Sequence, residues 1–169
     1  YLPDHPVDGL EATMRIDEAL DGVEIVVLAI PSSVILDVVD DVIPHLRPGH
    51  VLIDLAKGLA PGKRLISQAI HEKLNLAQKT NPLAVVTGPT IAPEAAGGVI
   101  TTALVASEDE SVARRLAETL TTQTFILHAA SDPVGAELWG AFKNVIALTC
   151  GLVDGLKKVG TLGGDNLKA

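Results

Sequence analysis

Short apolar runs alternate along the chain with segments in which apolar residues recur at helical spacing. The runs VEIVVLAI (23–30), VLIDLA (51–56) and LAVVT (83–87) are rich in β-branched and aliphatic residues, as is typical of strands covered on both faces. TALVAS (102–107) and TFILHA (124–129) continue the series. These five runs are predicted to be strands of one sheet.

The segments between the runs are predicted to be helices. They are SVILDVVDDVIPHL (33–46), Gly62 to Asn75, a short segment from Thr90, and residues 109–120. Strands that alternate with helices imply βαβ crossovers. The predicted fold class is therefore α/β, with a doubly wound, mostly parallel sheet.

The alternation of predicted strands and helices ends after Asp132. Pro133 suits the first position of a helix, and residues 134–157 form a long helical stretch without a further proline. VGTLGG (159–164) then predicts a turn and DNLKA (165–169) the start of another helix. We expect two domains: residues 1–132 form part of a dinucleotide-binding sheet, and residues 133–169 begin a helical substrate-binding domain.

The N-terminal segment YLPDHPVDGLEATM (1–14) has the composition of a loop, and no strand followed by G-x-G-x-x-G precedes VEIVVLAI. That motif is the usual phosphate-binding turn of nucleotide-binding sheets. If this is such a sheet, its first βαβ unit lies upstream of residue 1. The chain is accordingly predicted to be an internal fragment with little or no activity alone.

Composition narrows the classes of partner. The net charge is −8 without a basic run, which argues against nucleic-acid binding, so an anionic substrate must be held by a few placed cations. The single cysteine and the five scattered histidines predict no disulfide and no metal site. Neither a signal peptide nor a continuous apolar span is evident, which favours a cytoplasmic setting without membrane insertion.

Ligands of open α/β sheets bind beyond the carboxyl ends of the strands. The segments that follow the first three strands are AIPSS (29–33), AKGLAPG (56–62) and TGPTIAPE (87–94). Pro31 and Ser32 either contact a cofactor or, with Ser33, cap the next helix.

The other two segments offer charge and backbone donors. Lys57 brings an ammonium group to the mouth of the crevice, or is a solvated charge. Gly88 and Thr90 lead into a helix whose free N–H groups suit a phosphate or carboxylate, with Thr90 as a plain helix cap as the alternative. Glu94, in the first turn, favours the helix dipole in either case.

The long helix contains the polar pair Lys143-Asn144 in an apolar setting, ELWGAFKNVIAL (137–148). Glu137 and Asn144 are seven residues apart and share a face, with Gly140 between them leaving room. A buried lysine is costly without a partner. Lys143 therefore either reaches solvent or lies at a site that uses its charge for proton transfer.

Together these segments resemble the NAD(P)-dependent glycerol-3-phosphate dehydrogenase family. The resemblance follows the family's order through nearly the whole chain, and its most specific parts are GPTIAPE and ELWGAFKNVIA. The matching segments are YLP (1–3), AIPS (29–32), AKGL (56–59), GPTIAPE (88–94), VGAELWGAFKNVIAL (134–148) and GDNLKA (164–169).

The resemblance implies a Rossmann-like fold and an oxidoreductase of glycerophospholipid and carbohydrate metabolism. It would interconvert glycerol 3-phosphate and dihydroxyacetone phosphate by hydride transfer with NAD or NADP. Lys143 would be the general acid/base, and Lys57 would contact both cofactor and substrate. The remaining expected contacts are Gly88 and Thr90 with the substrate, and Pro31, Ser32 and Ala92 with the cofactor; Glu94, Glu137 and Asn144 would support them.

Two other functions remain open at this point. One is a different dehydrogenase with a Rossmann-like and a helical domain, acting on a small hydroxy acid. The other is a non-catalytic nucleotide-binding module, although such a module has no need of a proton donor. The expected partner is a small phosphorylated three-carbon substrate, and a homodimer is one possible assembly.

Overall fold

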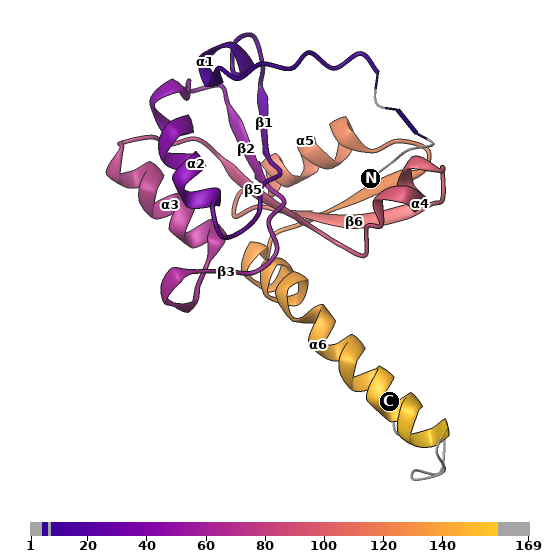
Figure 1. Ribbon diagram of the computed structural model, residues 1–169. Coiled ribbons are helices and arrows are strands. Elements are labelled where there is room, and N and C mark those ends of the chain that lie inside the picture. Colours follow the sequence, from indigo (N-terminus) through magenta and orange to yellow (C-terminus); the bar gives the residue numbers. More distant parts are fainter. Residues whose placement is uncertain (1–4, 7, 159–169) are drawn as a thin grey trace.

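The computed structural model describes residues 5–6 and 8–158, and a five-stranded sheet forms the centre of this part of the chain (Figure 1). The strand order is β1-β2-β5-β6-β7. The strands are β1 (Ile25–Leu28), β2 (Val51–Asp54), β5 (Leu83–Thr87), β6 (Thr101–Ala106) and β7 (Phe125–Ala130). All five lie within or next to the apolar runs of the sequence, so the expected strands are confirmed.

The sheet is mostly parallel, as predicted. β1 pairs with β2, β2 with β5, and β6 with β7 in parallel, whereas β5 and β6 are antiparallel with Val86 opposite Val105. The connection between β5 and β6, residues 88–100, contains the short helix α4 (Ala92–Ala96).

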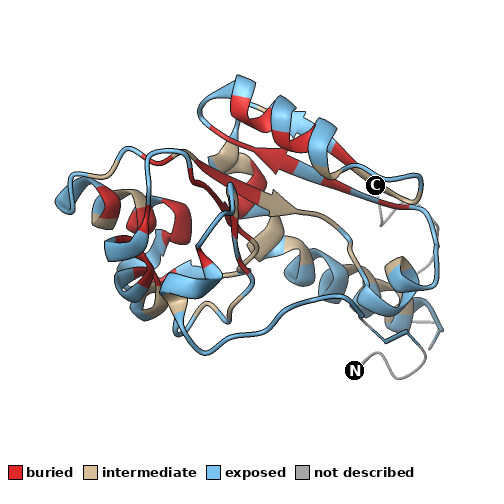
Figure 2. Ribbon diagram, turned by 90° about the horizontal axis from the view of Figure 1, so that it is seen from above, coloured by how far each residue is buried: buried red, intermediate tan, exposed pale blue. Residues whose placement is uncertain are grey.

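Helices cover both faces of the sheet, which confirms the doubly wound α/β class. α2 (Ile35–Val42) and α3 (Ile66–Leu76) pack with Leu52 in one apolar core. α5 (Glu110–Leu120) packs with Ile53 in a second core on the opposite face. Buried residues lie along the strands and on the helix faces turned toward them (Figure 2). Alternate residues of β2 thus point into different cores, as the period of a strand requires.

The segment before α3 corrects the expected helix start at Gly62. A hairpin of β3 (Leu59–Ala60) and β4 (Arg64–Leu65) precedes α3, with a 3-10 turn over Pro61–Lys63. Gly62 and Lys63 have φ values of 79° and 59°. Such left-handed backbone cannot continue a right-handed helix, so α3 begins at Ile66 instead.

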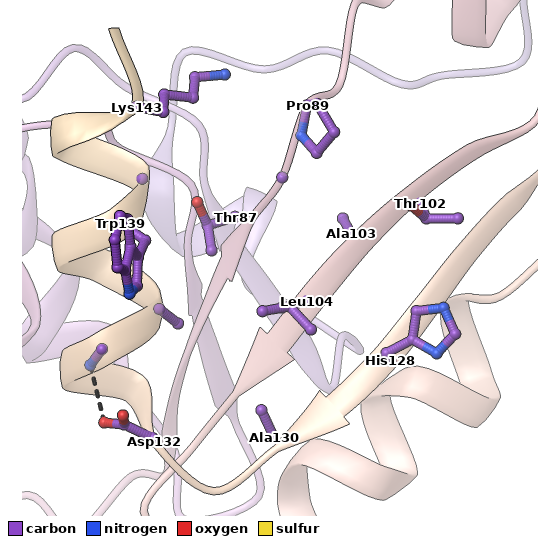
Figure 3. Close-up of a pocket in the computed structure, with 14 residues that line it drawn as sticks. Thr87, Pro89, Thr102, Ala103, Leu104, His128, Ala130, Asp132, Trp139 and Lys143 are labelled. Atoms are coloured by element: carbon purple, nitrogen blue, oxygen red, sulfur yellow. Dashed lines mark hydrogen bonds between the residues drawn. The ribbon is translucent and has the colours of Figure 1, made fainter. Parts of the chain in front are cut away.

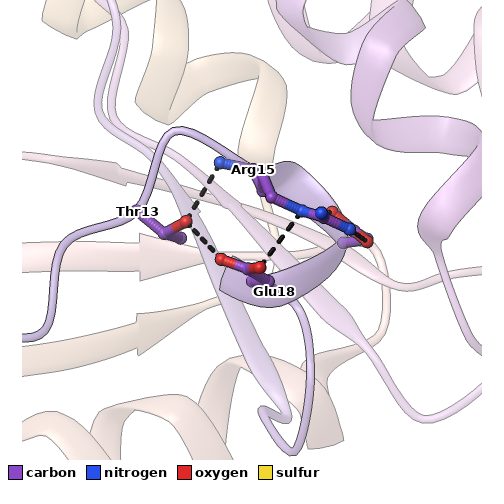
Figure 4. A network of polar contacts seen from close by, with 4 residues as sticks. Thr13, Arg15 and Glu18 are labelled. Carbon is purple, nitrogen blue, oxygen red and sulfur yellow. Dashed lines mark hydrogen bonds and ion pairs between the residues drawn. The ribbon is translucent and has the colours of Figure 1, made fainter.

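The described part of the N-terminal segment forms no regular element before α1 (Ile16–Ala19). Thr13, Arg15 and Glu18 hold the start of α1 in a polar network (Figure 4). The Thr13 hydroxyl donates to Glu18 at 2.6 Å, and Arg15 Nε lies 3.1 Å from the other Glu18 oxygen. Because these side chains are exposed, their ion pairs add little to stability.

The long helix α6 (Pro133–Lys158) begins where the sequence places it and extends away from the sheet (Figure 1). Asp132 caps it by accepting the Gly135 N–H at 2.8 Å, with Pro133 at the first helical position. Only Ala136 and Glu137 of α6 are buried. The turn expected at 159–164, the helix start expected at 165–169 and the YLP segment lie outside the described residues.

α6 changes one expectation about membranes. Among the described helices it alone is long and apolar enough, by length and composition, to cross a bilayer, whereas no continuous apolar span was expected from the sequence. The two results differ because the mean hydropathy of a helix stays high when a few residues are charged, whereas Glu137 and Lys143 interrupt the continuous apolar run. Length and composition alone are weak evidence for a span, because the core helix of a soluble protein and a signal sequence pass the same test.

Candidate active site at the strand ends

The segments after β1, β2 and β5 meet at one edge of the sheet, as expected for parallel neighbours. The backbone of Gly58 lies so close to Ser32 that a Cβ on Gly58 would stand 3.2 Å from the Ser32 hydroxyl oxygen. Gly58 also has φ +137°, which an L side chain rarely adopts. Glycine therefore lets the Lys57-Gly58 turn approach the loop after β1.

Four of the predicted site residues line one cleft of about 350 Å³, which we call the strand-end cleft. Lys57 follows β2, Gly88 follows β5, and Thr90 and Ala92 lead into and begin α4. A volume of this size is within the range of small-molecule sites. Thr90 is half-buried and does not cap α4, whose N-cap is Ile91, so the plain-cap interpretation of Thr90 is wrong.

A second cleft of about 560 Å³ lies between α6 and strands β5, β6 and β7, and we call it the α6 cleft (Figure 3). Its walls are mostly apolar. Lys143 extends from α6 at the end of this cleft where Thr87 and Pro89 also lie. Thr87 and Gly88 line both clefts, so the two clefts adjoin at the end of β5.

Two glycines bring the backbone elements of the site together. A Cβ on Gly88 would stand 2.8 Å from the Ala103 Cα, so Gly88 permits the close approach of the segment after β5 to β6. A Cβ on Gly140 would stand 2.4 Å from the Thr87 hydroxyl oxygen. Gly140 was expected to leave space on its face of the helix, and the end of β5 packs into that space.

Lys57 and Lys143 converge although they are far apart in the sequence. Partial burial lowers the pKa of Lys57, and the positive charge of nearby Lys143 lowers it further. Both effects disfavour the protonated amine. Lys57 lines the strand-end cleft and Lys143 lines the α6 cleft, so the two lysines lie on adjoining clefts rather than in the single cleft expected from the sequence. Their shared role in one site stays a prediction.

Glu137 lies at the N-terminus of α3 rather than in the open crevice. One carboxylate oxygen accepts the backbone N–H groups of Ile66 and Ser67, at 2.6 and 3.3 Å, and the other accepts the Ser67 hydroxyl. The N-cap residue of α3 is Leu65, which has no side-chain acceptor. Glu137 therefore supplies, from α6, the cap that the local sequence lacks.

Asp54, which was not among the predicted site residues, is a buried carboxyl group at the end of β2 and is 1% exposed. Its Oδ1 accepts the Ala56 N–H at 2.8 Å, while its buried Oδ2 has no hydrogen-bond partner. Burial raises the pKa of Asp54 to about 7, and the nearby charge of Glu137 acts in the same direction. The available signal was an acidic residue inside the apolar run VLIDLA.

The other predicted residues lie at the margins. Pro31 is exposed and Ser32 half-buried, and no side chain caps α2, so the capping role considered for these serines is wrong. Glu94 is exposed in the first turn of α4, where it favours the helix dipole as expected. Asn144 is exposed on the part of α6 beyond the sheet. It does not join Glu137 in a polar face at the crevice.

The sheet and its two helix layers define a Rossmann-like α/β domain continued by a long helix. The profile described as the NAD-dependent glycerol-3-phosphate dehydrogenase N-terminus matches residues 1–113, and the corresponding C-terminus profile matches residues 132–169. The chain belongs to the NAD-dependent glycerol-3-phosphate dehydrogenase family.

Individual relatives agree with the family. The chain is 40% identical over its whole length to a protein from an Exiguobacterium species named glycerol-3-phosphate dehydrogenase (NAD(P)+), covering 48% of that protein. It is 39% identical to a Streptomyces griseus protein of the same name, covering 99% of this chain and 48% of the relative. The chain thus spans about half the length of the curated relatives it matches.

Solved structures show the same fold. A glycerol-3-phosphate dehydrogenase from Coxiella burnetii superimposes with a TM-score of 0.79 at 32% identity, covering 98% of this chain and 49% of that one. The enzyme from Saccharomyces cerevisiae gives a TM-score of 0.79 at 26% identity, covering 99% and 48%. These matches support the Rossmann-like sheet and the long helix that follows it.

Proposed function

We propose that this chain forms part of an oxidoreductase that interconverts glycerol 3-phosphate and dihydroxyacetone phosphate with NAD or NADP. The observation that supports the proposal most is that Lys57 and Lys143 line two clefts that adjoin at the end of β5. Family membership and the names of the relatives support the same reaction.

The strand-end cleft fits the reacting half of a nicotinamide cofactor together with a small substrate. Its volume is about 350 Å³, and Lys57, Gly88 and Thr90 line it. Ala92, also on this cleft, and the Pro31-Ser32 turn are proposed to border the cofactor. A bound nicotinamide would supply the hydride donor or acceptor.

Lys143 is proposed as the general acid and base. When the carbonyl of dihydroxyacetone phosphate is reduced, negative charge develops on its C2 oxygen, and an ammonium group there donates the proton. In the reverse direction the neutral amine accepts the proton from the C2 hydroxyl. Lys57 adds a second positive charge that stabilises the developing oxyanion and attracts the anionic substrate.

The proposed division into domains places the boundary near residue 132. Asp132 caps α6, and the two family profiles match on either side of residues 114–131. The cytoplasmic setting and the homodimer expected from the sequence stay predictions.

The reaction is tested with the purified product of the complete gene. Glycerol 3-phosphate is compared with unphosphorylated glycerol and with a small hydroxy acid such as lactate, each with NAD+ and with NADP+. We expect rapid formation of reduced cofactor only with glycerol 3-phosphate. Faster turnover of the hydroxy acid would support the rival dehydrogenase, and cofactor binding without turnover of any substrate would support a non-catalytic module.

A further inference from the structure

The base of α6 is fastened to the sheet domain by a few specific contacts. Gly140 abuts Thr87 at the end of β5, and Ala136 is buried in a small apolar cluster with residues of β5 and β6. The third contact is the Glu137 carboxylate on the N-terminus of α3. Beyond Gly140 every residue of α6 is at least partly exposed. The direction of the helix is therefore set at its base.

We propose that Glu137 is a positioning residue, whose carboxylate ties α6 to α3 and thereby holds Lys143 beside Lys57. This inference rests on the proposed function insofar as Lys143 acts on substrate. Glu137 itself is buried and contacts α3 rather than the clefts. It acts on the reaction only through the placement of Lys143.

The geometry makes the placement sensitive to this contact. Lys143 follows Glu137 by six residues, or about 9 Å along the helix axis. A tilt of about 10° at Glu137 would shift the backbone at Lys143 by roughly 1.6 Å. Misplacement of a reacting group by about 1 Å can cost on the order of a hundredfold in rate.

Two buried carboxyl groups lie near each other here, and their partners differ. Glu137 accepts three hydrogen bonds, two of them from N–H groups at the positive end of the α3 dipole. Asp54 accepts one and leaves Oδ2 without a partner. Burial raises the pKa of Asp54 to about 7, so its neutral form is favoured below that pH. Glu137 is the carboxyl group whose hydrogen bonds join α6 to α3.

Because Glu137 and Asp54 differ in their hydrogen-bond partners, the same carboxyl-to-amide change at each gives a matched pair of variants, made in the product of the complete gene. Glu137→Gln removes the charge and leaves one amide oxygen to accept an N–H. Asp54→Asn removes a carboxyl group that is mostly neutral below its pKa of about 7 and keeps an oxygen for the Ala56 N–H. We expect Glu137→Gln to lower kcat about 10- to 100-fold. Asp54→Asn should leave kcat within about twofold of the wild-type value.

A second readout follows the position of Lys143 without requiring turnover. The pH dependence of amine labelling at Lys57, read by mass spectrometry, reports the Lys57 pKa, which Lys143 lowers. In Glu137→Gln the Lys57 pKa should rise toward its ordinary value, and in Asp54→Asn it should not change. A general loss of packing at α3 would lower the unfolding temperature without this selective change in folded protein.

The outcomes separate the two levels of the proposal. If folded Glu137→Gln keeps both kcat and the Lys57 pKa of the wild type, the positioning role is overturned. A raised Lys57 pKa with unchanged kcat supports the positioning of Lys143 and contradicts its catalytic role. If the wild type does not turn over glycerol 3-phosphate, the proposed function fails while the labelling still tests Glu137.

If Glu137→Gln fails to fold, Ser67→Ala decides the question. This variant removes only the hydroxyl that donates to the second Glu137 oxygen and leaves both backbone contacts. We expect a smaller fall in kcat, about two- to fivefold, and a rise in the Lys57 pKa. Wild-type values of both quantities in Ser67→Ala would overturn the inference.

Discussion

The two lysines of the site come from regions that are built in opposite ways. Lys57 follows β2, a central strand of the sheet whose four residues are all buried. Lys143 lies on α6, in which only Ala136 and Glu137 are buried. The sheet fixes one amine through its continuous core, whereas the other depends on a few contacts at the base of a helix. Perturbations of α6 should therefore alter activity before they alter the fold.

The sharpest contrast between these regions is expected from Lys143→Ala in the product of the complete gene. Removing a general acid/base should lower kcat by about 10²- to 10⁴-fold. The unfolding temperature should change little, because Lys143 lies outside all three apolar clusters. Steady-state kinetics and thermal unfolding measure the two effects.

The control for this variant is Lys158→Ala, at an exposed position on the last turn of the same helix. It should leave kcat unchanged. Near-normal turnover by Lys143→Ala would remove Lys143 from the chemistry.

The second prediction concerns the sheet region and the pH dependence of its stability. Asp54 at the end of β2 has a pKa that is raised from 3.8 to about 7 in the folded state. Between these two pH values the folded chain holds a proton that the unfolded chain has released, so stability falls as pH rises. Asp54→Asn keeps the neutral form at every pH. At pH 8 it should increase the free energy of unfolding by up to about 4 kcal/mol, and near pH 4 by little.

Denaturant unfolding of the wild type and Asp54→Asn between pH 4 and 8 checks this prediction. The exposed Asp41→Asn serves as a control, because a solvated carboxylate gains little from folding. A difference between Asp54→Asn and wild type that does not grow with pH would show that Asp54 is ionised in the folded protein.

The contact of α6 with β5 is tested by two glycines of that helix. Gly140→Ala places a Cβ 2.4 Å from the Thr87 oxygen, so α6 or Thr87 must shift. Such overpacking should cost about 1–3 kcal/mol of stability and lower kcat as well. In Gly151→Ala the new Cβ meets nothing within 4 Å. It should stabilise the helix by up to about 1 kcal/mol and leave kcat unchanged.

Chemical denaturation and kinetics of both glycine variants measure these effects. If Gly140→Ala matched Gly151→Ala in both, the position of α6 against β5 would not matter to the site.

Patterns within short segments were sufficient to predict most of the fold. The run LAVVT at 83–87 coincides with β5, and Asp132-Pro133 marks the start of α6, because strand burial and helix capping leave local signals. Ligands of open α/β sheets bind beyond the carboxyl ends of the strands, and this rule correctly placed the Lys57 and Gly88 segments at one edge of the sheet.

What the sequence did not predict depends on partners far away in the chain. The start of α3 was placed too early because the left-handed turn at Gly62 and Lys63 precedes it. The cap of α3 also lies far away in the sequence, at Glu137, about seventy residues later. The acidic character of Asp54 was visible, but its burial without a partner for Oδ2 depends on the tertiary packing around it. Glu137 was assigned to a polar face on spacing alone, which cannot show that the N-terminus of another helix lies opposite.

The most direct test of the account is the pKa of Lys57 with and without the charge of Lys143. Amine labelling across pH would compare the wild type with Lys143→Met and with Lys158→Met in the product of the complete gene. We predict that the Lys57 pKa rises in Lys143→Met and remains below its ordinary value because of burial. In Lys158→Met it should not change. An identical Lys57 pKa in all three proteins would show that the two amines do not share a site.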